Sequence, residues 1–146
     1  MGKINYGRVF LGGLLALLVL IIAELVLEYL VLANIPAIGS EQQRFLEAFG
    51  ETRADGFIND VINVLSAYLT CCLFVWVYAA VRPRFGPGPK TAIIVSVAFL
   101  IYWTLLLAWF SNVGLFPIKL SAVSFLTNLI ELPLAILAGA WIYRES

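Results

Sequence analysis

Histidine is missing from this sequence, and charged residues are scarce, at 12% of its 146 positions. Without histidine the chain cannot form a His-ligated haem, a His-based zinc or iron site, or a Ser–His or Cys–His nucleophile. Its two cysteines, Cys71 and Cys72, are adjacent; they lack the Cys-x-x-Cys spacing of thiol oxidoreductases, which favours a buried structural role. Nine basic residues balance nine acidic ones, which argues against nucleic acid as a partner. We therefore expect no cofactor, no metal site and no nucleic-acid binding.

Hydrophobic residues make up 62% of the chain, and the mean hydropathy is +0.98. A soluble domain is about half apolar and about a quarter charged, so this composition excludes a water-soluble globule. Residues 61–81 and 91–118 are uncharged runs of 21 and 28 residues. A helix of about 20 apolar residues crosses a bilayer core of about 30 Å. The sequence predicts a multi-pass membrane protein whose first partner is the lipid bilayer.

The hydrophobic pattern predicts an all-α fold, a membrane four-helix bundle that forms a single domain over residues 1–146. Too little chain remains outside the helices for a separate soluble domain. Lys3 and Arg8 precede the first apolar run, as in a signal peptide, but that run is too long for one and contains Glu24 and Glu28. We expect it to be a retained helix. The four helices are predicted at about residues 9–33, 57–81, 90–110 and 118–143.

The distribution of Lys and Arg predicts the orientation of the bundle. Six of the nine basic residues fall on one side, before the first helix, between the second and third helices, and after the fourth. Because basic residues accumulate in cytoplasmic loops, both termini are expected in the cytoplasm. Residues 82–90 contain three prolines, and proline cannot continue a helix, so we expect a tight inner turn there.

The first outer loop is predicted to contain a short amphipathic surface helix. Ser40 followed by Gln43 has the form of a capping box, and Gly50 suits a helix end. Such a helix is either a lid or an ordinary surface connector. Its apolar and acidic faces would be formed by Phe45, Leu46 and Phe49, and by Glu41 and Glu47.

Polar residues at membrane depth are the candidates for function. Glu24 and Glu28 lie one turn apart on the same face of the first predicted helix. Polar residues in the second helix are spaced by four, three and four positions, and in the fourth helix by three, four and three, so each set forms one stripe. These stripes should turn inward, because polar groups facing lipid are costly. The stripes are Asn59, Asn63, Ser66 and Thr70, and Ser121, Ser124, Asn128 and Glu131.

With a rise of about 1.5 Å per residue, the three sets of polar residues fall within the same outer half of the membrane. We therefore predict a polar pocket between the first, second and fourth helices, open to the outside. The ligand- or ion-binding residues predicted for it are Glu24, Glu28, Asn63, Ser66, Ser124, Asn128 and Glu131.

No Lys or Arg is expected beside the three carboxylates at membrane depth. Lys119 is twelve residues from Glu131, about 18 Å along a helix. An ionised group near the bilayer centre costs at least about 2.5 to 3.5 kcal/mol. Either the carboxyls stay protonated and bond to the neighbouring amides and to one another, or an external cation completes the site. A third possibility is that Arg44 or Arg53 folds down from the outer loop.

Three functions are compatible with this pattern. In the favoured one, the pocket binds a proton, a cation or a small amphiphilic (lipid-like) ligand from the outer side, with translocation as an extension. In the second, the chain is a structural or accessory subunit, or a homo-oligomeric scaffold, whose buried polar residues fix helix packing. A membrane enzyme that uses Glu as general acid or base ranks last, because a carboxylate alone gives no nucleophile–base pair. We assign no catalytic residue.

The sequence resembles a group of small four-helix bacterial integral membrane proteins of uncharacterised function. The resemblance lies in residues 5–9 (NYGRV), 78–92 (YAAVRPRFGPGPKTA) and 131–145 (ELPLAILAGAWIYRE). It implies a multi-pass protein of the bacterial cytoplasmic (inner) membrane. It brings no activity, substrate or catalytic residues.

Overall fold

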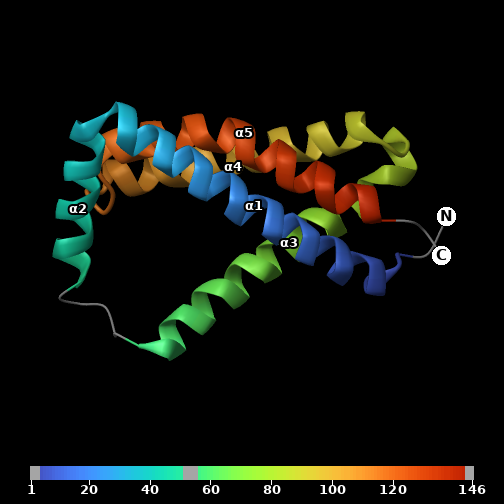
Figure 1. Ribbon diagram of the computed structural model, residues 1–146. Coiled ribbons are helices and arrows are strands. Elements are labelled where there is room, and N and C mark those ends of the chain that lie inside the picture. Colours follow the sequence, from blue (N-terminus) through green and yellow to red (C-terminus); the bar gives the residue numbers. More distant parts are fainter. Residues whose placement is uncertain (1–3, 51–55, 144–146) are drawn as a thin grey trace.

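The computed structural model describes residues 4–50 and 56–143, and these residues form helices and no strands. Four of the helices are long and apolar enough to cross a membrane, and one, α2, is shorter. The all-helical fold with four long apolar helices is therefore confirmed. In chain order the helices are α1 (Tyr6–Asn34), α2 (Pro36–Gly50), α3 (Phe57–Phe85), α4 (Pro89–Asn112) and α5 (Ile118–Ile142) (Figure 1).

The long helices α1, α4 and α5 run beside one another, and α5 packs against both of the others. The short helix α2 lies across one end of this group, and the start of α1 and the end of α5 lie together at the opposite end (Figure 1). We name these the α2 end and the terminal end. Helix α3 packs against α1 and α5 near the terminal end, and its first half leans away from the bundle.

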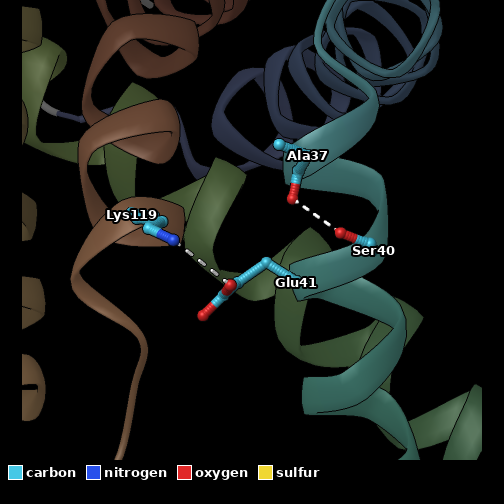
Figure 2. A network of polar contacts seen from close by, with 4 residues as sticks. All are labelled: Ala37, Ser40, Glu41 and Lys119. Carbon is cyan, nitrogen blue, oxygen red and sulfur yellow. Dashed lines mark hydrogen bonds and ion pairs between the residues drawn. The ribbon is translucent and has the colours of Figure 1, made fainter.

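Two predicted helix boundaries are wrong. Helix α3 continues to Phe85 with Pro83 inside its last turn, because proline removes only one backbone hydrogen bond there. The helix ends at Gly86, whose φ of 85° few other residues adopt and whose N–H donates to the Arg82 carbonyl. The surface helix α2 begins at Pro36, since proline suits the first helical position. Ser40 is therefore not its cap; the Ser40 hydroxyl donates to the Ala37 carbonyl at 3.0 Å (Figure 2).

The core lies where α1, α3 and α5 cross, and small residues allow the close approach. Ala16 and Ala135 are completely buried. A Cβ atom on Gly139 of α5 would lie 2.5 Å from Val75 Cγ2 and 3.1 Å from the Gly12 carbonyl oxygen. These distances leave no room for a side chain, so the small residues serve packing within one chain. The free cysteines, Cys71 and Cys72, are buried in this core.

Hydrogen bonds from backbone N–H groups to two tyrosine hydroxyls stabilise the terminal end. The Tyr143 hydroxyl accepts a hydrogen bond from the Asn5 backbone N–H at 3.3 Å, and the Tyr78 hydroxyl accepts one from the Gly88 backbone N–H at 3.0 Å. The two rings pack edge to face with their centroids 6.2 Å apart. These contacts link the start of α1, the end of α5 and the α3–α4 turn at this end.

Many large apolar side chains face outward on the long helices. Ile22 is 62% exposed and Leu105 is 66% exposed, although both lie in the middle of their helices. Soluble monomers rarely expose contiguous apolar patches of more than a few hundred Å². The surface therefore suits a lipid environment, in agreement with the four helices that are long enough to cross a membrane.

Candidate functional site

A cavity of about 730 Å³ lies at the α2 end of the bundle. All five helices contribute to its wall, and its volume falls within the range of small-molecule sites, about 300–1,000 Å³. Most of the lining is apolar. The polar side chains that line it are Glu24, Glu28, Gln42, Thr70, Ser124, Thr127, Asn128 and Glu131.

The cavity brings together the three carboxylates that the sequence places at membrane depth. Glu24 and Glu28 come from successive turns of α1, and Glu131 comes from α5. Glu131 is only 7% exposed, Glu28 is half-buried, and Glu24 is exposed. The helices that carry Glu24 and Glu131, α1 and α5, pack directly against each other. The acidic residues of the first and last long helices therefore converge.

Within residues 4–50 and 56–143, no Lys or Arg forms an ion pair with these carboxylates. The Lys119 ammonium pairs with Glu41 of α2 at 3.6 Å, which lies outside the cavity lining (Figure 2). Arg44 is exposed on α2 and does not line the cavity. Arg53, the other candidate cation, lies outside the described residues. The site is acidic without compensation from the part of the chain that is described.

The two amide side chains in the lining have different partners. The Gln42 Nε2 of α2 donates to Glu28 Oε1 at 2.8 Å, which occupies one carboxylate. The Asn128 Nδ2 donates to the Ser124 backbone carbonyl at 2.6 Å, on its own helix. The Thr127 hydroxyl, one turn before Glu131, donates to the Ser124 backbone carbonyl at 3.3 Å. Neither of the two amides therefore donates a hydrogen bond to Glu24 or to Glu131. Glu131 is nevertheless buried.

The structure does not bring Asn63 and Ser66 to this cavity. Both are exposed on the first half of α3, which leans away from the other helices. The buried residues of α3 begin only at Cys71, because its close contact with α1 depends on the glycines near the terminal end. Helix α3 instead lines the cavity with Thr70, Leu73 and Phe74.

Helix α4 forms the wall for which the sequence predicted no role. Aromatic side chains are concentrated there and on the adjacent part of α3, and their apolar faces line the cavity. Tyr102 and Trp103 lie near the middle of a long apolar helix, whereas aromatic anchors normally lie at the membrane interfaces. That unusual position was a signal in the sequence. The aromatic residues of these two helices that line the cavity are Phe74, Phe99, Tyr102 and Trp103.

Helix α2 covers one side of the cavity. Its residues Ile38, Gln42, Phe45 and Leu46 line the cavity, and the Phe45 ring packs edge to face on Phe116 at 5.0 Å. The exposed residues on its other face include charged ones, so α2 is amphipathic. Its ion pair from Glu41 to Lys119 and its hydrogen bond to Glu28 connect it to α5 and α1.

The fold and the cavity together define a helical protein with four potential membrane spans and an acidic cavity at one end. In the described residues, no three acidic or cysteine side chains are grouped closely enough to hold a metal ion. Comparison of the chain with protein-family models, with curated proteins and with solved structures gives no match. The resemblance to small four-helix bacterial membrane proteins therefore stays a prediction.

Proposed function

We propose that this protein binds a proton, a cation or a small amphiphilic molecule in the cavity at its α2 end. One observation supports this most directly: Glu131, at 7% exposure, lines a cavity beside Glu24 and has no cationic partner among the described residues. A buried charge is normally paired, and an acidic side chain within a membrane helix indicates a functional site by default. A positively charged ligand or a proton would supply the missing compensation.

We further propose that the cavity opens to the outside of a bacterial inner membrane, with both termini in the cytoplasm. Four basic residues of the described chain, Arg8, Arg82, Arg84 and Lys90, lie in the first turn of α1 or on either side of the α3–α4 turn, at the terminal end, as the positive-inside rule requires of a cytoplasmic face. Gly12 and Gly139, which pack closely against Val75, lie about two helical turns nearer the terminal end than the cavity residues Leu20 and Glu131. In this conformation we expect access to the cavity from the outside only. Translocation would require the helices to separate where α1, α3 and α5 cross.

Charge-selective labelling tests the proposal. Ser124→Cys places a thiol in the lining, and the native cysteines are 0% and 7% exposed, so the unmodified protein serves as the blank. In intact cells we expect a membrane-impermeant cationic methanethiosulfonate to react about tenfold faster than an anionic one, since nearby carboxylates attract the cation. Adding Glu131→Gln should reduce this ratio.

Ser40→Cys is the matched control because Ser40 is exposed on α2 and does not line the cavity. There the two reagents should react at similar rates. Equal rates at Ser124→Cys, or no reaction from outside the cell, would contradict an outward-opening acidic cavity.

A structural role in a homo-oligomer or as an accessory subunit is the second candidate, and one observation favours it. Asn63 and Ser66 are exposed on the half of α3 that leaves the bundle. Polar side chains can form hydrogen bonds between helices in the membrane, worth about 0.6 kcal/mol on average. If α3 packs against a second copy, Asn63→Leu should weaken the dimer about threefold in mild detergent, measured by light scattering over a concentration series. Monomers at every concentration would contradict the homo-oligomer.

A further inference from the structure

We infer that the ligand of this cavity is a lipophilic organic cation, an amine or quaternary ammonium attached to an apolar body. The inference rests on the proposed function and specifies its ligand. Two properties of the lining carry it: a carboxylate pair at one place and an extended aromatic and aliphatic wall at another. A ligand that uses both must have a positive charge and a hydrophobic part.

The positive charge is assigned to the space between Glu24 and Glu131. Glu28 already accepts a hydrogen bond from Gln42 at 2.8 Å, whereas Lys119, the basic residue nearest in sequence to this part of α5, pairs with Glu41. Glu24 and Glu131 line the same cavity, so a cation held between them would be attracted by both carboxylates. A neutral or anionic ligand would leave both charges uncompensated.

The hydrophobic part is assigned to the wall formed by α3 and α4. Phe74, Phe99, Tyr102 and Trp103 line the same cavity as the carboxylates. Aromatic faces attract organic cations through cation–π interaction, most strongly for Trp. They also bury apolar surface of the ligand, which is favourable in proportion to the area removed from water.

A metal ion fits this lining poorly. Within the described residues, no three acidic or cysteine side chains are grouped closely enough to hold one ion. A cavity of about 730 Å³ is far larger than such an ion requires, and hydration water would then face an apolar wall. Size, charge and surface thus all favour one organic molecule with a single positive head.

Three probes separate the contributions of charge and body. Tetraphenylphosphonium and tetraphenylborate have nearly the same shape and opposite charge, and tetramethylammonium has the charge with little apolar body. We expect the purified protein in lipid nanodiscs to bind tetraphenylphosphonium, with at least about tenfold weaker binding of the other two, by equilibrium dialysis corrected with empty nanodiscs. Glu131→Gln should weaken tetraphenylphosphonium about 30-fold, the equivalent of about 2 kcal/mol.

Glu47→Gln is the matched control, because Glu47 is exposed on α2 and does not line the cavity. This variant should bind tetraphenylphosphonium as tightly as the unmodified protein does. Glu24→Gln repeats the test should Glu131→Gln fail to fold. Equal binding of the borate, equal binding of tetramethylammonium, or no binding of any probe would overturn the inference. If the labelling of Ser124→Cys is nevertheless charge-selective, the acidic cavity stands and only the ligand class is wrong; if labelling is unselective, the proposed function itself fails.

Discussion

Glu131→Met is expected to stabilise the protein by about 2 kcal/mol while it lowers the preference of the cavity for cations, since Glu24 and Glu28 remain in the lining. Glu131 is buried, with an exposure of only 7%. It has no cationic partner among the described residues. A charge buried without a partner is destabilising, and even a buried ion pair can often be replaced by well-packed apolar residues with no loss or with a gain of about 1 to 4 kcal/mol. Methionine has a similar length and adapts to irregular space.

This variant distinguishes a binding site from a scaffold. The free energy of unfolding would be measured in mild detergent by titration with a denaturing detergent, together with the ratio of cationic to anionic labelling at Ser124→Cys. Glu47→Met on the exposed face of α2 is the control and should change stability by less than about 0.5 kcal/mol. A loss of stability in Glu131→Met would show that the carboxyl group holds the bundle together, as the scaffold hypothesis requires.

Gly139→Val is expected to destabilise the bundle by about 3 kcal/mol, because the site has no space for a side chain. The first added carbon would lie 2.5 Å from Val75 Cγ2 and 3.1 Å from the Gly12 carbonyl oxygen. Val75 is completely buried, so it cannot turn away, and the carbonyl belongs to the backbone of α1. The helices would have to separate, which loses the contacts of the whole crossing.

A double-mutant cycle attributes this loss to the contact between α3 and α5. Gly139→Ala and Val75→Ala should each destabilise the protein, and the double variant should lose about 1 to 2 kcal/mol less than the sum. Gly7→Ala is the control: its new Cβ would meet only Asn5 Oδ1, at 3.5 Å, and alanine favours helix by up to about 1 kcal/mol. Additive losses in the cycle would show that the close approach is not the cause.

The candidate site was predictable in part. Glu24, Glu28, Ser124, Asn128 and Glu131 all line the cavity, because their spacing places them on one face of their helix and the cost of facing lipid turns that face inward. The same reasoning predicted that Asn63 and Ser66 line the pocket, and they do not line the cavity. Their stripe is as regular, but half of α3 leans out of the bundle (Figure 1). The periodicity of one helix shows which face is polar and does not show which helix lies opposite.

The sequence by itself determined the number and approximate length of the long helices and the presence of carboxylates at membrane depth. These properties depend on each residue's preference for lipid or water and on hydrogen bonds within a helix, which are local. Only the tertiary structure decided that α4 forms the aromatic wall, that α2 covers the cavity and that α3 diverges. These features depend on how closely segments far apart in the chain approach, and that is set by contacts such as Gly139 with Val75.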